Sequence, residues 1–177
     1  MSWKKLLAAY TGSLFILGLV MAALRKKAAA CTLLLITALL AGFLVFICLF
    51  SPYRVSGLSM YPAYHPGQIV FTEPYPDARS AERGDVIVFH SDDLSADLIK
   101  RIEGLPGDTV QITGGKLFIN GEVVEEGFEP MEQAGMAAFP VTLKEGEFFV
   151  LGDNRNESLD SRDLGPVPFV QIKGKVR

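Results

Sequence analysis

The first 50 residues of this 177-residue chain contain no acidic side chain. They hold five basic ones, so the other 127 residues carry 12 basic and 20 acidic side chains, a formal charge of −8. A nucleic-acid-binding surface needs a basic face that neutralises phosphates. The acidic balance therefore excludes nucleic acid as a partner of this larger part.

Cysteine is scarce, because the chain has only Cys31 and Cys48, both within one apolar run. On a helix that rises about 1.5 Å per residue, their separation corresponds to about 25 Å, which is too far for a disulfide. The polar part of the chain has no cysteine, so cysteine content does not indicate whether it lies in an oxidising or a reducing compartment.

Histidine is limited to His65, in a predicted turn, and His90, at the end of a predicted strand. A solvated position is the simplest interpretation of both, with a Ser-His-Asp triad as the minority alternative. A calcium loop that starts at Asp153 is disfavoured, because Arg155 takes a ligand position and the central glycine is missing. We therefore expect neither a metal nor a cofactor.

Two long apolar runs are present. Residues 6–24 and 28–50 are 19 and 23 residues without a charge, and about 20 are needed to cross a bilayer as a helix. Only Arg25, Lys26 and Lys27 separate them, so the pattern predicts a transmembrane helical hairpin over residues 1–50. The positive-inside rule places this turn in the cytoplasm and residues 51–177 outside, as the extracytoplasmic domain of a multi-pass plasma-membrane protein, although Lys4 and Lys5 argue for the reverse.

An alternative makes the first apolar run a cleavable signal peptide, which the charges after residue 24 disfavour. Phe50 and Ser59 are nine residues apart, so the chain between them spans at most about 30 Å. Ser59 should therefore act close to the membrane surface, and its substrate should be membrane-tethered.

Short β-rich stretches fill the rest of the chain and predict a mostly antiparallel β domain. Gly114-Gly115 and Asn120-Gly121 are strong hairpin signals. Residues 125–140 are acidic and without a clear period, and are interpreted as a surface loop. The predicted strands are 68–72, 85–90, 97–102, 110–113, 116–119, 122–124 and 147–151, with 170–173 as an edge.

Ser59 follows the second apolar run closely. Gly57 precedes it and Pro62 follows it, which predicts a sharp bend that presents one hydroxyl. An ordinary turn is the alternative. A nucleophilic role for Ser59 therefore depends on a base elsewhere in the chain.

Lys100 is the candidate base. In a strand it shares a face with Leu98 and Ile102, and burial of that face would favour the neutral amine. Lowering its pKa from about 10.4 to about 8 requires roughly 3 kcal/mol, which burial can supply. A neutral lysine amine can act as the general base for a serine. The alternative, which the period alone favours, is an edge-strand lysine whose charge stays in water.

A polar cluster directly follows the apolar strand 147–151. Acids, amides, arginines and serines alternate over residues 152–162, which predicts a network of hydrogen bonds and ion pairs that shapes the loop. A solvated polar loop is the alternative.

Four segments together resemble the conserved boxes of type I signal peptidases of the bacterial type. They are Ser-Met-x-Pro at 59–62, Arg-Gly-Asp-Val with its apolar tail at 83–89, Lys-Arg-Ile-x-Gly-Leu-Pro-Gly-Asp at 100–108 and Gly-Asp-Asn-Arg-x-x-Ser-x-Asp-Ser-Arg at 152–162. Relatives from the endoplasmic reticulum have histidine where this chain has Lys100.

The resemblance implies a membrane-bound serine endopeptidase with a signal-peptidase-like β fold that cleaves signal peptides from exported preproteins near the secretion translocon. Ser59 would be the nucleophile and Lys100 the general base, acting through an acyl-enzyme. Ser158 would hydrogen-bond to the lysine amine and orient it. The residues that would shape the site are Asp160 and Arg162, as an ion pair, with Asp153 and Arg155 in the same loop.

The family binds its substrate as an added β-strand between two segments, with shallow pockets that select Ala-x-Ala. Here the matching residues are Tyr53, Val55, Gly57 and Leu58 on one side and Asp97, Leu98 and Ile99 on the other. The backbone N–H of Ser59 would be one oxyanion donor. Some relatives have a serine hydroxyl at the position of Gly57, and Ser56 or a main-chain group is the candidate replacement.

Other functions stay open. The SOS-repressor self-cleavage proteins have the same pair of residues, but they are soluble, which the apolar runs disfavour. A dedicated peptidase for a pilus or conjugation substrate fits the motifs equally well. A non-catalytic, membrane-anchored domain that binds exported chains is the third possibility.

Overall fold

A computed structural model describes residues 27–125 and 127–177, with side chains between residues 27 and 49 described for 32–46 only. The chain divides into two compact units, Met1–Ile47 and Cys48–Arg177. The predicted first apolar span, residues 6–24, lies outside the described residues.

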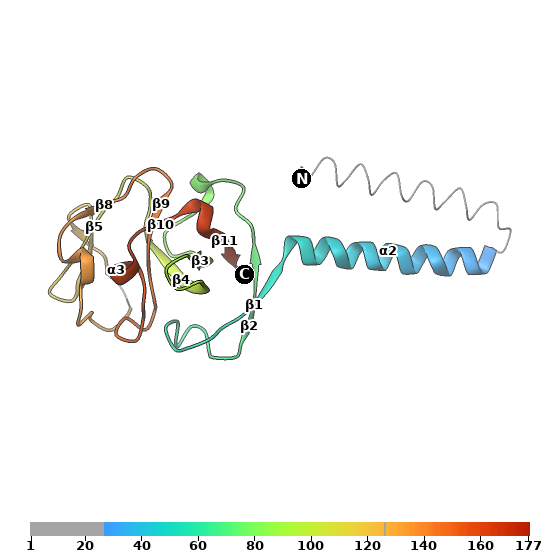
Figure 1. The fold of residues 1–177 in the computed structure, drawn as a ribbon, viewed down its shortest axis with the longest axis horizontal. Helices are drawn as coiled ribbons and strands as arrows, with labels where there is room; N and C mark the ends of the chain where they lie inside the picture. Colours follow the sequence, from blue (N-terminus) through green and yellow to red (C-terminus); the bar gives the residue numbers. More distant parts are fainter. Residues whose placement is uncertain (1–26, 126) are drawn as a thin grey trace. The chain divides into compact units, whose positions relative to one another are not determined.

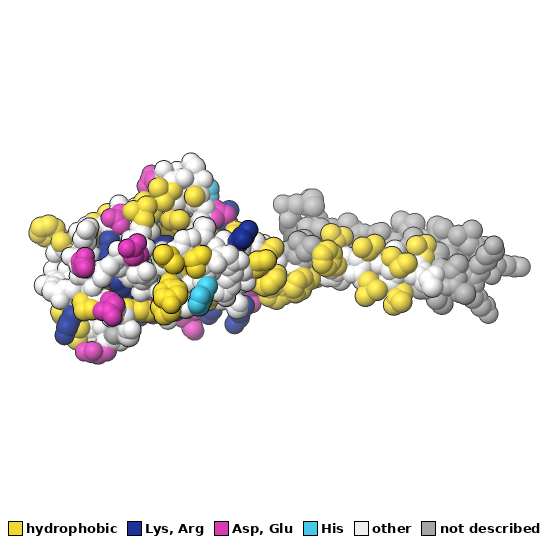
Figure 2. All heavy atoms as spheres, turned by 90° about the horizontal axis from the view of Figure 1, so that it is seen from below, with side chains coloured by type: hydrophobic (Ala, Val, Ile, Leu, Met, Phe, Trp, Pro, Cys, Tyr) yellow, Lys and Arg dark blue, Asp and Glu magenta, His cyan; other side chains and the backbone are white. Residues whose placement is uncertain are grey.

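Helix α2, Lys27–Leu49, coincides closely with the second predicted span. Its leucine- and alanine-rich sequence has a high helix propensity. Leu35, Leu39 and Leu44 are each more than half exposed, and Figure 2 shows hydrophobic side chains along the described part of α2. Within the part of the chain that the structure describes, no helix combines the length and the apolar character needed to cross a membrane.

The second unit is built from short strands (Figure 1). The strands are β1 (Ser51–Arg54), β2 (Ile69–Glu73), β3 (Val86–Ser91), β4 (Ala96–Gly104), β5 (Thr109–Thr113), β6 (Lys116–Ile119), β7 (Glu122–Val123), β8 (Val141–Thr142), β9 (Glu147–Leu151), β10 (Val167–Pro168) and β11 (Ile172–Val176). The short helices between them are η1 (Ala78–Ser80), η2 (Gly135–Ala138), α3 (Ser161–Leu164) and η3 (Phe169–Gln171).

The strands form a seven-stranded sheet in the order β1-β2-β11-β3-β4-β9-β10 and a four-stranded sheet in the order β7-β6-β5-β8. The strand pairs are antiparallel, which confirms the predicted class. Figure 1 shows the labelled strands of the small sheet at one end of this unit, with β1 and β2 toward the other.

Strand β9 is buried on both faces, as its continuous apolar sequence predicts. Phe149 and Leu151 belong to the core cluster of the small sheet, while Phe148 and Val150 belong to a cluster of the large sheet. This alternation follows from the two-residue period of a strand. Because β9 leads directly into residues 152–162, it gives that loop a rigid starting point.

The two predicted hairpins are confirmed. Strands β5 and β6 are joined through Gly114 and Gly115, and β6 and β7 through Asn120 and Gly121. All four turn residues have positive φ, which is the conformation that asparagine and glycine adopt most readily in tight hairpin turns.

The position of the last strand was predicted wrongly. Residues 170–173 were expected at an edge, but the strand is β11, Ile172–Val176, and it lies between β2 and β3. Its partners are separated from it by 80 residues or more of sequence, so no local pattern indicates this pairing.

Residues 125–140 are not simply a surface loop. They include η2, and Met131 and Ala137 are buried in the core of the small sheet. A four-stranded sheet needs a cover on its apolar face, and this irregular segment supplies part of it. The sequence of the segment has no helical or strand period, so its burial left no periodic signal.

Candidate active site

Ser59 lies in a tight turn between two buried anchors. Val55 and Met60 are 4% and 1% exposed, while Gly57 has φ +81°, a left-handed conformation that glycine adopts without strain. The N–H of Tyr61 closes the turn on the carbonyl of Leu58 at 3.0 Å. The turn therefore holds the Ser59 side chain at a fixed position beside the sheet.

Lys100 is buried in the middle of the large sheet, with 3% of its surface exposed. Strand β4 pairs with β3 on one side and, from Arg101 onward, with β9 on the other. The alternative of an exposed edge lysine is therefore wrong. Lys100 lies opposite the fully buried Ile87, so an apolar side chain lies beside its stem.

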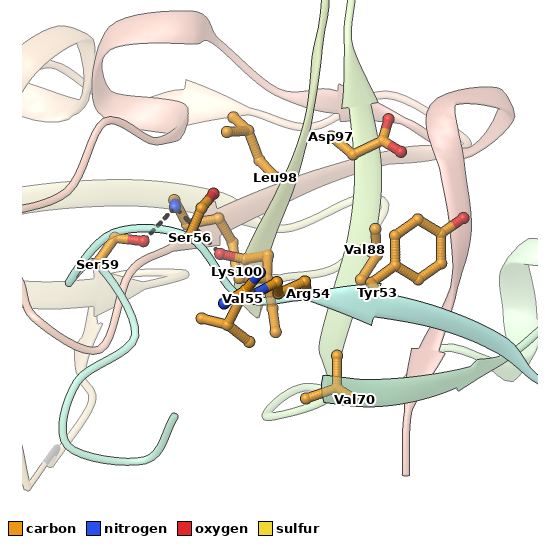
Figure 3. A pocket seen from close by; sticks show the side chains of 11 residues that line it. Tyr53, Arg54, Val55, Ser56, Ser59, Val70, Val88, Asp97, Leu98 and Lys100 are labelled. Carbon is orange, nitrogen blue, oxygen red and sulfur yellow. Dashed lines mark hydrogen bonds between the residues drawn. The ribbon is translucent and has the colours of Figure 1, made fainter. Parts of the chain in front are cut away.

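The amine of Lys100 points at Ser59 (Figure 3). Its Nζ donates to Ser59 Oγ at 2.8 Å and to the Ile99 carbonyl at 3.1 Å. Burial lowers the pKa of this amine from near 10.5 to about 8, and the charges of Asp160 and Asp153 oppose the shift without cancelling it. The pair thus joins a hydroxyl to an amine that is readily deprotonated.

The histidines do not form a triad with this serine. His90 Nδ1 is hydrogen-bonded to Asp97 at 2.8 Å, and the His65 ring contacts Tyr61. Within the described part of the chain, Ser59 Oγ is instead hydrogen-bonded to Lys100.

The loop of residues 152–162 holds the backbone around Ser59. The N–H of Asn154 donates to the Ser59 carbonyl at 3.0 Å, and the Asn154 side-chain amide donates to the Leu58 carbonyl at 3.3 Å. Gly152 lies so close that a Cβ there would be 2.6 Å from the Ser59 carbonyl oxygen and 2.2 Å from Ser158 Oγ. Asn154 and Gly152 are site residues that motif reading left without a role.

Ion pairs fix the same loop. Asp160 accepts hydrogen bonds from both Nε and Nη2 of Arg162 at 2.9 Å, so the predicted ion pair is present. Asp160 also accepts a hydrogen bond from the Gly152 N–H at 3.0 Å. Arg155 pairs with Glu103 at 3.0 Å inside the protein. Arg155 was predicted to belong to this network, but its partner Glu103 was not predicted.

Arg101 connects three of the motif segments. Its guanidinium binds Asp153 at 2.8 and 2.6 Å, and it donates to the Gly84 carbonyl at 2.8 Å. Together with the bonds of Lys100 and Asn154 to the turn at Ser59, these contacts bring all four motif segments to one place. Segments separated by up to about 100 residues in sequence thus form one site.

Ser158 differs from its prediction. Its Oγ is buried and has no hydrogen-bond partner among the described residues, so the predicted bond to Lys100 is not formed in this structure. The lysine amine donates to Ser59 and to the carbonyl of its own neighbour instead.

A groove runs from the Ser59–Lys100 pair between the two predicted substrate segments. Figure 3 shows Ser59 and Lys100 at one end and Tyr53 and Asp97 at the other. Five of the seven predicted residues line the groove, but Gly57 and Leu58 do not, because the turn carries them outward. The lining residues are Tyr53, Arg54, Val55, Ser56, Ser59, Val70, Val88, Asp97, Leu98, Ile99 and Lys100.

Charged side chains fix the position of Asp97 at the far end of the groove. Asp97 accepts a hydrogen bond from Lys173 at 2.7 Å and contacts His90. The bond from Lys173 lowers the pKa of Asp97, and His90 contributes in the same direction. Asp97 is therefore an ionised wall of the groove at neutral pH.

Within the described residues, the backbone N–H of Ser59 donates no hydrogen bond to another backbone group. It is therefore available to an oxygen atom bound at the groove. Ser56 lines the groove, whereas Gly57 has no side chain to offer. In the described ranges, no group of three or more metal-ligating side chains is assembled.

Known proteins resemble this chain over most of its length. The family model described as "Signal peptidase, peptidase S26" matches residues 28–177. Signal peptidase I of Bacillus licheniformis is 37% identical over 153 residues, 79% of this chain and 81% of that protein.

Two further proteins are similar. Signal peptidase I S of Bacillus subtilis (strain 168) is 37% identical over 154 residues, 79% of this chain and 82% of that protein. A crystal structure of a signal peptidase I from Enterococcus faecalis V583 is 33% identical and covers 55% of this chain and 97% of that one, with a TM-score of 0.49. From the family match over residues 28–177 and the identity to these relatives, the chain belongs to the signal peptidase family, peptidase S26.

Proposed function

We propose that this chain cleaves signal peptides from exported preproteins after small residues, with Ser59 as the nucleophile and Lys100 as the general base. Members of its family are serine peptidases, which are hydrolases. The observation that carries the proposal is the 2.8 Å bond between Lys100 Nζ and Ser59 Oγ, made by an amine whose pKa burial lowers to about 8.

The reaction follows from this contact. The neutral Lys100 amine takes the proton of Ser59 as Oγ attacks the scissile carbonyl, and the resulting ammonium gives that proton to the leaving amine. This leaves the signal peptide as an ester on Ser59 and frees the new N-terminus of the mature protein. Lys100 then takes a proton from the water that attacks the ester, and returns it to Ser59 Oγ as the signal peptide leaves with a free carboxyl group.

The negative oxygen of the tetrahedral intermediate needs hydrogen-bond donors. We assign the Ser59 N–H to this role. It belongs to the same planar peptide unit as the Leu58 carbonyl, which accepts bonds from Tyr61 and from the Asn154 side chain. Holding that carbonyl fixes the direction of the N–H, so Asn154 orients the donor before substrate binds.

The substrate would bind by strand addition. Strand β9 pairs with β4 only from Arg101 to Gly104, so residues 97–99 have one edge that no described strand occupies. An extended peptide can add its backbone to this edge while the groove accepts alternate side chains. Small residues before the cut, as in Ala-x-Ala, are the expected preference.

The remaining residues of the 152–162 loop would act by holding the catalytic groups in place. We propose that the ion pair of Asp160 and Arg162 and the pairs made by Asp153 and Arg155 keep residues 152–162 against the serine. Ser158 lies beside Gly152, and its Oγ has no hydrogen-bond partner among the described residues. A lysine ammonium has three N–H groups, and Ser158 would accept the third when Lys100 becomes protonated.

Ser158→Ala should lower kcat by about 10- to 100-fold and leave some cleavage, because one charge-assisted hydrogen bond is lost in the charged intermediate. Its stability should not fall, since the hydroxyl has no partner to lose. Steady-state kinetics and thermal unfolding of the purified variant measure both effects. Full activity would show that this hydroxyl orients nothing.

We propose that the domain of residues 51–177 lies on the extracytoplasmic side of the plasma membrane, held by residues 6–24 and 28–50. Signal peptidases I are typically membrane-associated. The charge-free runs and the exposed apolar side chains of α2 support this proposal. Preprotein signal peptides, the lipid bilayer and the nearby translocon would be the partners.

The test is cleavage of a preprotein with an Ala-x-Ala site by the detergent-solubilised chain over a pH series, with Ser59→Ala as the control. Cleavage should occur after the second alanine. Its rate should rise with pH through about 8, because the active base is the deprotonated form of Lys100. A folded wild-type chain that cleaves no such site would favour a dedicated substrate or a binding role.

A further inference from the structure

A polar side chain of the 152–162 loop attaches that loop to residues 128–138, which we name the strap. Asn156 Oδ1 accepts the N–H of Glu132 at 3.0 Å, and Asn156 Nδ2 donates to the carbonyl of Pro130 at 3.2 Å. An amide that accepts and donates in this way takes the place of a backbone pair in a strand ladder. Asn156 therefore both accepts a hydrogen bond from the strap backbone and donates one to it.

Three further contacts join the same two segments. Arg162 Nη1 donates to the Gln133 carbonyl at 3.1 Å. The Arg155 guanidinium lies 4.4 Å from the centre of the Phe128 ring, a favourable cation–π distance. A Cβ on Gly135 would be 2.3 Å from the Arg162 carbonyl oxygen, so the two backbones touch at a point where only glycine fits.

The strap itself is fixed to the small sheet. Met131 and Ala137 are 5% and 0% exposed in the core cluster of that sheet. The N–H of Met131 also donates to the Gly115 carbonyl at 3.0 Å. The strap is therefore a firm support, and the 152–162 loop is held between it and strand β4.

We infer that the strap positions the catalytic pair: it fixes the 152–162 loop, which in turn holds the Ser59 carbonyl and excludes water from the Lys100 amine. This inference rests on the proposed function. It assigns Asn156 and Gly135 as positioning residues, although neither lines the groove. Asn156 occupies one of the unspecified positions of the loop motif, so its contacts are a property of this chain.

Two consequences separate this role from ordinary stability. Loosening the loop should reduce kcat more than it changes KM, because the groove residues are untouched. Water reaching Lys100 should raise the pKa of its amine, because burial is the main cause of its low value. The rise of activity with pH should then move to higher pH.

The test compares Asn156→Ala and Gly135→Ala with Glu157→Gln in the full detergent-solubilised chain. Glu157 is the exposed neighbour of Asn156, so its variant should match wild type. Asn156→Ala should lower kcat about tenfold, the loss expected for two hydrogen bonds, with KM within about twofold of wild type and an alkaline shift of the pH profile. Gly135→Ala should also lower kcat and shift the pH profile, because its new Cβ pushes the strap away from Arg162.

A second readout does not depend on cleavage. Amide hydrogen exchange over residues 152–162 should be faster in Asn156→Ala than in wild type, whereas exchange in the core strands should change much less, because Asn156 is exposed and its two bonds are local. Wild-type kcat, pH profile and exchange in a folded Asn156→Ala would overturn the inference. If wild type itself cleaves nothing, the proposed function fails, and the exchange measurement still decides whether the strap fixes the loop.

Discussion

Lys100→Met should lower kcat/KM by about 1,000-fold or more, because general-base catalysis contributes about 100- to 10,000-fold and this lysine serves both steps. Methionine keeps the unbranched stem and cannot take a proton. The measurement is preprotein cleavage under single-turnover conditions, with an acylating inhibitor as a probe of Ser59. Normal turnover by the variant would remove Lys100 from the mechanism.

The same variant should be more stable than wild type at pH 7. The folded state lowers the pKa of this amine from near 10.5 to about 8, which corresponds to about 3 kcal/mol of differential interaction. Loss of the hydrogen bonds to Ser59 and Ile99 offsets part of this, so we expect a net gain of about 1–2 kcal/mol.

The pH dependence has a definite sign. Below about pH 8 the amine is charged in both states, and the full cost of burying it is present. Between about 8 and 10.5 the unfolded chain binds more protons, so wild-type stability rises with pH relative to the variant. Denaturant unfolding of both proteins at pH 7 and pH 10 tests this, and an advantage of the variant that grows with pH would contradict it.

Gly152→Ala should lower kcat by about 100-fold, because a displacement of about 1 Å in a catalytic group has an effect of that order. The new Cβ would lie 2.2 Å from Ser158 Oγ, 2.5 Å from Ser158 Cβ and 2.6 Å from the Ser59 carbonyl oxygen. The oxygen belongs to the backbone of the nucleophile, so the turn that presents Ser59 must move. Overpacking should also cost about 1–3 kcal/mol of unfolding free energy.

Gly127→Ala is the matched control for this change. It lies in the same domain, has no positive φ, and a Cβ there meets nothing within 4 Å, so kcat and stability should stay near wild type. Ser158→Gly in the Gly152→Ala background should recover part of the lost stability, because it removes two of the three close contacts. Wild-type kcat in Gly152→Ala would mean that the 152–162 loop does not set the position of Ser59.

Local patterns were sufficient for most of the strands. The hairpins around Gly114-Gly115 and Asn120-Gly121 were predictable, because positive φ at these residues is encoded by the residues themselves. Strand β9 was predictable because it is buried on both faces and therefore uniformly apolar. The place of β11 between β2 and β3 was not, since strand pairing across most of the chain leaves no local trace.

The site was predictable only through its resemblance to a family. Period alone favoured an exposed Lys100, because a strand lysine with one apolar face looks the same whether its strand is internal or at an edge. Burial of the Lys100 side chain, opposite Ile87 of β3, decided the question and lowered the pKa of the amine. The predicted bond between Ser158 and Lys100 is not formed in this structure, because contacts between loops depend on distances that sequence spacing does not contain.

Sequence alone thus determined most of the strands, the antiparallel β class and the residues able to supply a nucleophile and a base. Tertiary structure decided that Lys100 is desolvated and 2.8 Å from Ser59, and that Gly152 and Asn154 hold the serine backbone. It also decided that the strap supports the loop through Asn156. The physical reason is that conformational preference is a local property of the chain, whereas desolvation and contact arise only when distant segments pack together.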